Sequence, residues 1–264
     1  MGLRLALVQF ARGERREENL RRMLDLLSTI SGADLVCLPE NWVGREVLEE
    51  GEWREVLGEL GEIAREGRFS LLTGGAYLRR GGRILSSCYA LDERGRVVGR
   101  SDKLFPSQST GERSFLSRGR EFGPFTLGGV KLGVVVCVDA LYPEPCRALS
   151  ARGAQLLLNP SNIPENRVGT WRQVGVTRAV ENGVFFAFVN NTHSTYPDGR
   201  KVVGHSFLVS PTGEVLAEAG EEETILEGEV NLSVLREVRS RWPFLRDTGR
   251  FWRRTGFSPS WRGG

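Results

Sequence analysis

A run of apolar residues from Leu132 to Val136 is the feature that most constrains the fold of this chain. An unbroken apolar run of this length is typical of a β-strand buried in a sheet. Cys137 follows the run directly, and the proline-rich residues 142–145 mark the start of a helix soon after it. The sequence therefore predicts a buried strand that ends in a thiol and turns into a helix.

The position of Cys137 makes it a candidate nucleophile. In open α/β sheets, ligands bind beyond the carboxyl ends of the strands, where a helix N-terminus favours a thiolate. The alternative is an inert side chain at the end of a core strand, because free cysteines are among the most buried residue types. Other residues of the chain are needed to choose between a nucleophile and an inert core side chain at Cys137.

Strands and helices alternate along the sequence. Apolar residues recur at helical spacing in residues 15–30 and 170–182, and further helices are expected within residues 46–68 and near 143–152. Strands are expected at residues 3–10, 33–40, 69–78, 83–92, 95–101, 132–136, 154–158, 183–190, 204–209, 214–219 and 224–230. Each half of the chain therefore contains a βαβ unit followed by further strands.

This order of elements predicts an α/β fold with four layers. Short sheets whose helices all lie on one side need their other faces buried. Stacking two such sheets face to face, with the helices outside, is the simplest solution. We therefore expect a four-layer α-β-β-α sandwich, with residues 1–239 as a single domain.

Residues 240–264 are expected to form a C-terminal tail. This segment interleaves arginines with the aromatic residues Trp242, Phe244, Phe251, Trp252, Phe257 and Trp261. Such a mixture occurs on surfaces that bind nucleic acid, but aromatic residues and arginine are also enriched at protein interfaces. We therefore expect the tail to pack on its own domain or on a partner subunit.

Composition excludes several classes of protein. The net charge of +3 is small for 264 residues, which argues against a nucleic-acid partner. The first residues lack the apolar stretch of a secretion signal, and no apolar run is long enough for a membrane span, so a cytoplasmic location is expected. The four cysteines lack paired spacing and do not cluster with the two histidines, which predicts reduced thiols and no metal site.

Two other residues strengthen the case for Cys137. Glu40 ends the expected strand at residues 33–40, although a solvated glutamate in a loop is the common alternative. Lys103 is one of only three lysines among 36 basic residues, so its retention calls for a reason. Glu112 lies in the long polar stretch 107–123, and loops of that length are usually functional or disordered.

Glu40, Lys103 and Cys137 are suited to nucleophilic catalysis that does not use a histidine. His193 and His205 follow strands of the second half, and no cysteine-protease signature surrounds any cysteine, which disfavours a papain-like enzyme. A buried carboxylate can act as general base toward a thiol once its pKa rises toward neutrality. A neighbouring lysine would lower the pKa of the thiol and stabilise a tetrahedral oxyanion.

Several motifs, in order, resemble those of the carbon-nitrogen hydrolase (nitrilase) superfamily, in its amidase- or carbamoylase-like branch. Leu38-Pro39-Glu40, Asp102-Lys103-Leu104 and residues 133–144 around Cys137 are similar to the glutamate, lysine and cysteine motifs of that family. The resemblance continues through Glu112 with Phe115 and Gly119, through residues 178–182, and through residues 204–206 with 211–213. It spans nearly the whole chain.

The resemblance implies a role for each motif residue. Cys137 would attack a carbonyl or nitrile carbon, and Glu40 would act as general base. Lys103 and the backbone N–H of Val138 would hold the oxyanion, and Glu112 would be a second acidic residue that positions substrate and lysine. The resemblance also implies the four-layer fold, no cofactor, and assembly into a homodimer or higher homo-oligomer.

Departures from the family pattern bear on the substrate. True nitrilases carry Trp-Glu after the nucleophile, whereas Val138-Asp139 stands here, which favours amides or carbamoyl compounds over nitriles. Some members have arginine where Leu141 stands, so one expected clamp for an acidic substrate is missing and small neutral amides are favoured. Asn162 and Ile163 are expected in the walls of the substrate pocket by their position alone.

The sequence thus predicts an enzyme that hydrolyses a non-peptide C–N bond in a small amide or N-carbamoyl compound. The reaction would pass through a cysteine thioester and release ammonia, and the only partners expected are this substrate and other copies of the chain. Nitrile hydrolysis and acyl transfer on the same site are alternatives, as is a catalytically silent binding subunit. The combination of Glu40, Lys103 and Cys137 argues against silence, because a binding subunit has no need of all three.

Overall fold

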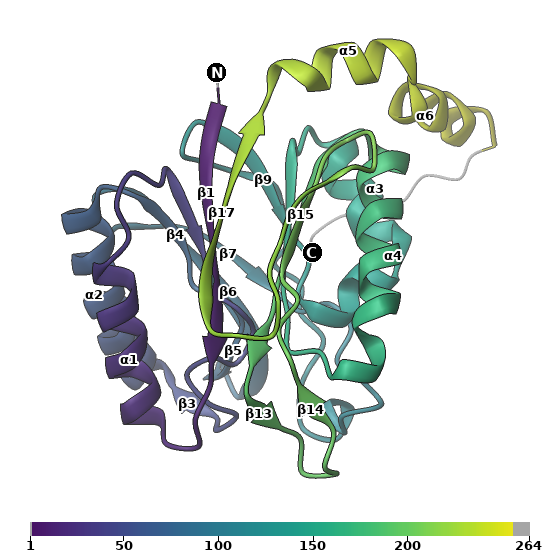
Figure 1. The fold of residues 1–264 in the computed structure, drawn as a ribbon. Coiled ribbons are helices and arrows are strands. Elements are labelled where there is room, and N and C mark those ends of the chain that lie inside the picture. The colour runs from purple at the N-terminus through teal and green to yellow at the C-terminus, as the bar shows by residue number, and fades with distance from the viewer. Residues whose placement is uncertain (1, 256–264) are drawn as a thin grey trace.

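The computed structural model describes residues 2–255, which form two β-sheets stacked face to face between two layers of helices (Figure 1). The first sheet contains the long strands β1 (Gly2–Ala11) and β17 (Thr224–Asn231), which pair antiparallel over most of their length. The tail residues Phe257 and Trp261 lie outside the described residues.

The first sheet runs in the order β12-β1-β2-β4-β6-β5-β3, with β17 also on β1 and β7 on β6. Strands β1, β2 and β4 are parallel, so their carboxyl ends lie at the same edge. The remaining strands of this sheet are β2 (Leu35–Cys37), β3 (Leu48–Glu49), β4 (Ser70–Leu72), β5 (Ala76–Arg80), β6 (Arg83–Leu91), β7 (Val97–Asp102) and β12 (Asn191–Thr192).

The second sheet runs in the order β16-β15-β11-β10-β9-β8, and its central strands β9, β10 and β11 are parallel. Its strands are β8 (Phe125–Leu127), β9 (Val130–Val134), β10 (Leu156–Pro160), β11 (Phe185–Val189), β15 (Phe207–Val209) and β16 (Val215–Glu218). A separate hairpin of β13 (Ser194–Thr195) and β14 (Lys201–Val202) extends from the bottom of the molecule in Figure 1.

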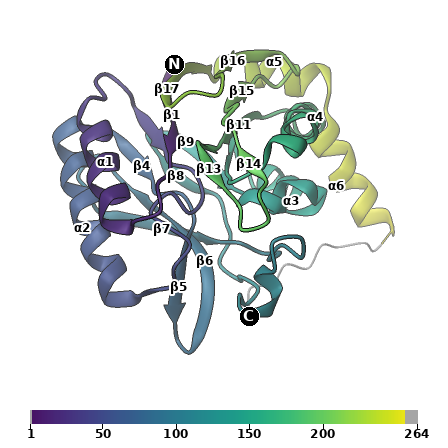
Figure 2. The ribbon, with the colours of Figure 1, turned by 60° about the horizontal axis from the view of Figure 1, so that its bottom comes forward.

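Helices cover the outer face of each sheet, which confirms the expected four-layer sandwich. Helices α1 (Arg16–Ser28) and α2 (Glu50–Gly67) lie on the first sheet, and α3 (Pro143–Ala151) and α4 (Glu165–Asn182) lie on the second (Figure 2). The short strands therefore have apolar neighbours on both faces, as their nearly unbroken apolar runs require.

Strand β1 shows how the core divides. Its side chains alternate between the two faces of the sheet, as the period of a strand demands. Leu3, Leu5 and Leu7 belong to the core between the two sheets. Ala6, Val8 and Phe10 belong to the core beneath α1 and α2, with Met23 and Trp53 among its other members. Burial on both faces fixes the register of β1, because a shift by one residue would exchange the two cores.

The structure differs from the sequence-based expectations in several elements. The strand expected at residues 69–78 is divided into β4 and β5, because the chain turns at Gly74 and Gly75. The strand expected at residues 224–230 forms, but it pairs with β1 in the first sheet instead of extending the second. Strand β8 was not expected, since its three residues are too few to show a period.

The tail begins with helices that periodicity did not reveal. Helix α5 (Ser233–Arg241) crosses the expected boundary at residue 239, and α6 (Phe244–Thr255) contacts α3 and α4 of the same chain. Within the described residues the tail thus packs on its own domain, while the division at residue 239 stays a prediction. No helix in residues 2–255 has the length and apolar character needed to cross a membrane.

Gly74 gives a test of how tightly the segment before Glu40 is packed. Its φ is +69°, and a Cβ atom there would lie 2.0 Å from the carbonyl oxygen of Pro39. Gly81 also has a positive φ, of +53°, but nothing lies within 4 Å of its Cβ position. Gly74→Ala should therefore combine a left-handed backbone with a steric clash and lower the free energy of unfolding by about 2–5 kcal/mol.

The measurement is urea unfolding of both glycine variants beside the unmodified chain. Gly81→Ala is the control and should cost only about 1–2 kcal/mol, because it carries the backbone strain alone. Equal losses in the two variants would show that the contact with Pro39 does not constrain the fold.

Candidate active site

Four side chains predicted from the sequence meet at one end of the sandwich. Glu40 follows β2, Lys103 follows β7, Glu112 lies in a single 3-10 turn at Glu112–Ser114, and Cys137 follows β9. All four are almost completely buried, with at most 6% of each residue exposed. Strand ends from both sheets therefore bring together residues that are nearly 100 positions apart in the sequence.

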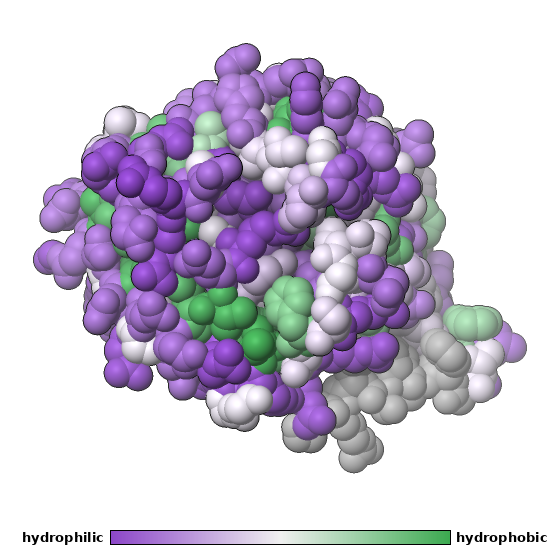
Figure 3. Space-filling model, turned by 90° about the horizontal axis from the view of Figure 1, so that it is seen from below, coloured by the Kyte–Doolittle hydropathy of each residue, from purple (hydrophilic) through white to green (hydrophobic). Residues whose placement is uncertain are grey.

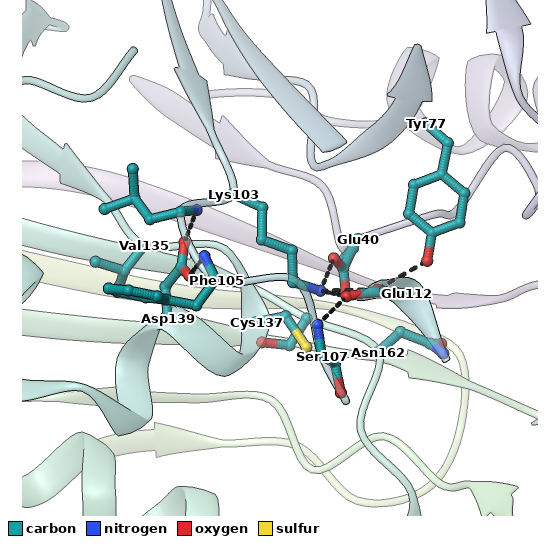
Figure 4. Close-up of polar contacts among 12 residues, drawn as sticks. Glu40, Tyr77, Lys103, Phe105, Ser107, Glu112, Val135, Cys137, Asp139 and Asn162 are labelled. Atoms are coloured by element: carbon teal, nitrogen blue, oxygen red, sulfur yellow. Dashed lines mark hydrogen bonds and ion pairs between the residues drawn. The ribbon is translucent and has the colours of Figure 1, made fainter. Parts of the chain in front are cut away.

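Lys103 is the centre of this group. Its Nζ donates to Glu40 Oε1 at 2.9 Å and to a carboxylate oxygen of Glu112 at 2.8 Å. Figure 4 shows the ammonium group between the two carboxylates, with the Cys137 sulfur beside them. Two carboxylates and one ammonium leave this group with a net negative charge when all three are ionised.

Glu112 is held by more than the lysine. The Tyr77 hydroxyl donates to its Oε1 at 2.8 Å, and the backbone N–H of Ser107 donates to its Oε2 at 2.6 Å. Every carboxylate oxygen of Glu112 therefore has a donor, which fixes the orientation of this carboxylate in the buried site. The start of the long polar stretch 107–123 is thus tied to Glu112.

The backbone of Glu40 connects the two sheets. Its N–H donates to the carbonyl oxygen of Ser161, which follows β10, at 3.2 Å. Its carbonyl oxygen accepts from the Asn191 side-chain amide of β12 at 2.7 Å. The backbone of Glu40 is therefore held in place by residues from the second half of the chain.

Cys137 lies in a strained turn. Its φ of +50° is in the left-handed region, which L-residues with a Cβ rarely adopt, and it opens a 3-10 turn, Cys137–Leu141. The side-chain amide of Asn159 donates to the carbonyl oxygens of Val135 at 2.6 Å and of Cys137 at 3.0 Å. The thiol interacts with the Glu40 carboxyl group and with the backbone N–H of Asn162.

Val138 places its backbone N–H at the start of the same turn. The first N–H groups of a helix have no partner within it, and this one makes no hydrogen bond among residues 2–255. Val138 also lines the cavity that contains Cys137. The group is thus free to donate to a ligand, and its expected role at an oxyanion stays a prediction.

Two residues without an assigned role from sequence hold this turn in place. Asp139 accepts the backbone N–H groups of Leu104 at 2.9 Å and Phe105 at 2.8 Å, which ties the cysteine turn to the segment after Lys103. Arg178 of α4 donates to the carbonyl oxygens of Ala140 at 2.9 Å and Leu141 at 3.0 Å. These contacts fix the turn from two sides.

Burial and charge set the protonation states. Burial, reinforced by Glu40, raises the pKa of the Cys137 thiol well above its ordinary value, so the resting sulfur is a neutral thiol. Burial also raises the pKa of Glu40, with Lys103 opposing and Glu112 adding to the shift. Burial alone would lower the pKa of Lys103, but the nearby carboxylates of Glu40 and Glu112 outweigh it and raise that pKa.

A cavity of about 320 Å³ opens over these groups. Val138, Leu141, Asn162 and Ile163 all line it, and the part of Leu141, Asn162 and Ile163 in binding the substrate stays a prediction. The remaining lining residues are Glu40, Asn41, Arg45, Tyr77, Lys103, Ser107, Ser109, Thr110, Glu112, Cys137, Pro164, Arg167, Trp171, Tyr196 and Arg200. The volume suits a small molecule, since ligand sites begin at about 300 Å³.

Sequence reasoning missed several of the residues that shape the site. Tyr77 lies in an ordinary strand pattern, and Tyr196 lies in a hairpin whose two strands have two residues each, so neither showed a signal. Asp139 did show a signal in the sequence, because a carboxylate two residues after a buried thiol needs hydrogen-bond donors. Among residues 2–255, no three His, Cys, Asp or Glu side chains gather in a way that could hold a metal ion.

The chemistry available here is attack by sulfur on a polarised carbon. A neutral thiol lies next to a carboxylate that can accept its proton, and an ammonium and a free N–H are at hand for a developing oxyanion. The structure brings Glu40, Lys103, Glu112 and Cys137 together, and their individual roles stay predictions.

Comparisons with known proteins agree with this chemistry. Residues 4–240 match the family model described as carbon-nitrogen hydrolase. The 2-oxoglutaramate amidase of Bacillus subtilis is 32% identical over 221 residues, a match that covers 81% of this chain and 85% of that protein.

Solved structures share the fold. A carbon-nitrogen hydrolase from Helicobacter pylori superposes with a TM-score of 0.85 at 24% identity, over 93% of this chain and 94% of that one. A mutant of the amidase from Nesterenkonia sp., with glutamine in place of a glutamate, superposes with a TM-score of 0.79 at 26% identity, over 91% of this chain and 96% of that one. In that structure the acetamide moiety of fluoroacetamide is covalently added at the active-site cysteine.

Asp139 yields a prediction about stability and pH. Burial raises its pKa from 3.8 to about 7, so the folded chain binds a proton here that the unfolded chain has already lost. The stability that this group contributes is present at low pH and is lost as pH rises toward 7. Asp139→Asn removes that dependence, so the stability advantage of the unmodified chain over this variant should shrink between pH 5 and pH 8.

Urea unfolding at both pH values measures the advantage. Asp92→Asn is the control, because hydrogen bonds from Arg96 lower the pKa of Asp92 and its titration lies below this window. Its stability difference from the unmodified chain should not change between pH 5 and pH 8. A difference that grows with pH for Asp139→Asn would contradict the assignment.

Proposed function

The chain belongs to the carbon-nitrogen hydrolase family, and we propose that it hydrolyses small primary amides through a thioester on Cys137, releasing ammonia. The observation that carries this assignment is the buried Lys103, paired with Glu40 at 2.9 Å and Glu112 at 2.8 Å beside the thiol. Enclosing three ionisable groups is costly, and a stacked sandwich does not need them for its stability. Their arrangement is accounted for by catalysis.

The proposed substrate class is supported by the relatives of this chain. The relative in Bacillus subtilis is named for 2-oxoglutaramate, an amide at one end of a dicarboxylic acid. We therefore propose such a small amide as the substrate. N-carbamoyl compounds remain the alternative from sequence, and they would enter the same cavity.

In the first half of the reaction, Glu40 accepts the proton of the Cys137 thiol while the sulfur attacks the carbonyl carbon. The carbonyl oxygen becomes an oxyanion that accepts hydrogen bonds from Lys103 and from the N–H of Val138. Glu40 then gives the proton to the amide nitrogen, the C–N bond breaks, and ammonia leaves. The product on the enzyme is a thioester.

In the second half, water attacks the thioester carbon, and Glu40 accepts a proton from that water. The C–S bond breaks, the carboxylic acid leaves, and the proton returns to the sulfur. One amide and one water thus give one acid and one ammonia. Glu40 acts as base and acid in turn, which requires its pKa to lie nearer neutrality than that of a free carboxyl group.

Glu112 keeps Lys103 in place throughout this cycle. Its carboxylate neutralises the ammonium when Glu40 is protonated, so the lysine retains a charged partner at every step. We also propose a cytoplasmic location. We further propose assembly into a homo-oligomer, which is supported by the family resemblance and by the exposed aromatic side chains of the tail, Trp242, Phe244 and Phe251.

Loss of the nucleophile or the base is the direct test. Ammonia release from a panel of small amides and N-carbamoyl amines should vanish in Cys137→Ala, because no thioester can form. It should fall about 100- to 10,000-fold in Glu40→Gln, which cannot accept a proton. Cys146→Ala is the control, since this buried cysteine lies in α3 and should keep most of the activity.

Intact-mass measurement after exposure to a limiting electrophile would then locate the reactive thiol. An adduct on Cys137 supports the nucleophile. Full activity in Cys137→Ala would rule the mechanism out, and no turnover of any amide by the unmodified chain would favour a silent binding subunit.

The pH profile tests the role of Glu112. Activity should rise with pH as Glu40 ionises, and the charge of Glu112 raises the pKa at which that happens. Glu112→Gln removes this charge, so the acid limb of kcat/KM should move to lower pH even though the maximum falls. Glu165→Gln, an exposed residue at the start of α4, should leave the limb in place. A shift to higher pH would contradict the proposed electrostatics.

A further inference from the structure

The cavity has two zones of opposite character. Its buried end holds Glu40, Glu112 and Lys103, a group with net negative charge. Three arginines line the remaining walls, Arg45, Arg167 and Arg200. Figure 3 shows the end of the molecule that carries the β13–β14 hairpin, and hydrophilic side chains predominate on it.

Arg45 has no acidic partner in the part of the chain that the structure describes. It makes no hydrogen bond or ion pair among residues 2–255, and its guanidinium lies 4.5 Å from the centre of the Tyr196 ring. Arg200 lies 5.0 Å from the same ring but is already paired with the exposed Asp198 at 2.7 Å. Both side chains are partly shielded from solvent, so the charge of Arg45 is the less compensated of the two.

Arg12 is a second guanidinium close enough to Arg45 to interact with its charge, although it does not itself line the cavity. Only 7% of this residue is exposed, and its donors reach neutral acceptors, the Asn41 carbonyl oxygen at 3.2 Å and Ser194 Oγ at 3.4 Å. In the described part of the chain no carboxylate lies within ion-pair distance of it. Burial and the charge of Arg45 lower the pKa of Arg12 to about 10.

A buried guanidinium without a counter-ion is unfavourable, because its desolvation is not offset. Arg12 and Arg45 repel each other as well. An anionic group in this part of the cavity would relieve both effects. The free site is therefore arranged for a ligand that carries a negative charge at this position.

Tyr196 relates the arginines to the reactive thiol. Its hydroxyl donates to the carbonyl oxygen of Asn162, whose own N–H interacts with the Cys137 sulfur. The same tyrosine ring contacts Arg45 and Arg200. The ring of Tyr196 thus contacts the arginines, and its hydroxyl contacts Asn162, which lines the same cavity as Cys137.

We propose that Arg45, supported by Arg200 and by the charge of Arg12, binds a carboxylate at the far end of the substrate. The enzyme therefore selects amides that carry a remote carboxylate over neutral amides of the same length. This inference rests on the proposed amidase function and names the residues that set its specificity.

The proposal reverses the expectation drawn from Leu141. An apolar residue there removes one clamp for an acidic substrate, and neutral amides were favoured for that reason. In the structure, positive charge enters the cavity from other elements, the loop before β3 and the β13–β14 hairpin. Arg45 presents a planar guanidinium, which can donate two parallel hydrogen bonds to one carboxylate.

The experiment compares succinamate with butyramide, in which a methyl group replaces the carboxylate. The measured quantity is the ratio of kcat/KM for the acid to that for the neutral amide. Arg45→Gln should lower this ratio about 10- to 100-fold, the usual effect of losing a charge-assisted hydrogen bond. Arg45→Lys should lower it less, and Arg45→Glu should lower it most.

Arg172→Gln is the matched control, because Arg172 lies on α4 outside the cavity and pairs with Glu218. Its ratio should equal that of the unmodified enzyme. A reduced ratio in Arg167→Gln with no change in Arg45→Gln would place the carboxylate on the Trp171 side of the cavity and overturn the assignment. An unmodified enzyme that cleaves both amides equally well would also overturn it.

Binding to the inactive Cys137→Ala variant separates this inference from the proposed function. Calorimetric titration with succinamate should show binding that is weakened about 10- to 100-fold when Arg45→Gln is added. Unchanged affinity would refute the carboxylate site, whatever the enzyme does to amides. Tight, Arg45-dependent binding without turnover by the unmodified chain would support the site and refute the amidase.

Discussion

The ion pairs of Lys103 with Glu40 and Glu112 are the interaction on which the site depends. Removing an ion from water costs on the order of several kcal/mol in a protein, and only close partners offset that cost. Lys103 is 1% exposed, and its ammonium pairs with the two carboxylates at 2.9 and 2.8 Å. The surrounding hydrogen bonds hold these three side chains in fixed positions. This matters because the loss of one partner would leave a buried charge uncompensated.

The fold fixes these positions by bringing the ends of several strands together. Glu40, Lys103 and Cys137 each follow a strand, but Glu40 and Lys103 come from the first sheet and Cys137 from the second. Hydrogen bonds then cross between the halves, from Glu40 to Ser161 and from Asn191 to Glu40. The site is therefore formed by the face-to-face packing itself, and a change in how the sheets stack would separate Glu40 from Cys137.

The residues proposed to react were recognisable in the sequence, and those that position them were not. Glu40 and Cys137 stand at the ends of apolar runs, and Lys103 stood out because arginine replaces lysine almost everywhere else. Arg178 and Asn159 act through backbone carbonyl oxygens of a turn that forms only when distant segments meet. No periodicity records such contacts. The same limit hid the return of β17 to the first sheet, because pairing partners of an edge strand depend on tertiary packing.

The two ends of the cavity differ in charge, and both ends bear on the proposed reaction at the thiol. Burial, reinforced by the charge of Glu40, keeps Cys137 protonated, so in the proposed mechanism the sulfur becomes nucleophilic only as Glu40 takes its proton. In the proposal above, Arg45 favours an anionic substrate group at the other end of the cavity, while Glu40 and Glu112 repel a substrate that enters with its carboxylate first. Opposite charge at the two ends thus orients an amide that carries a carboxylate with its carbonyl carbon at the sulfur. Orientation of this kind comes from the positions of fixed charges and needs no movement of the chain.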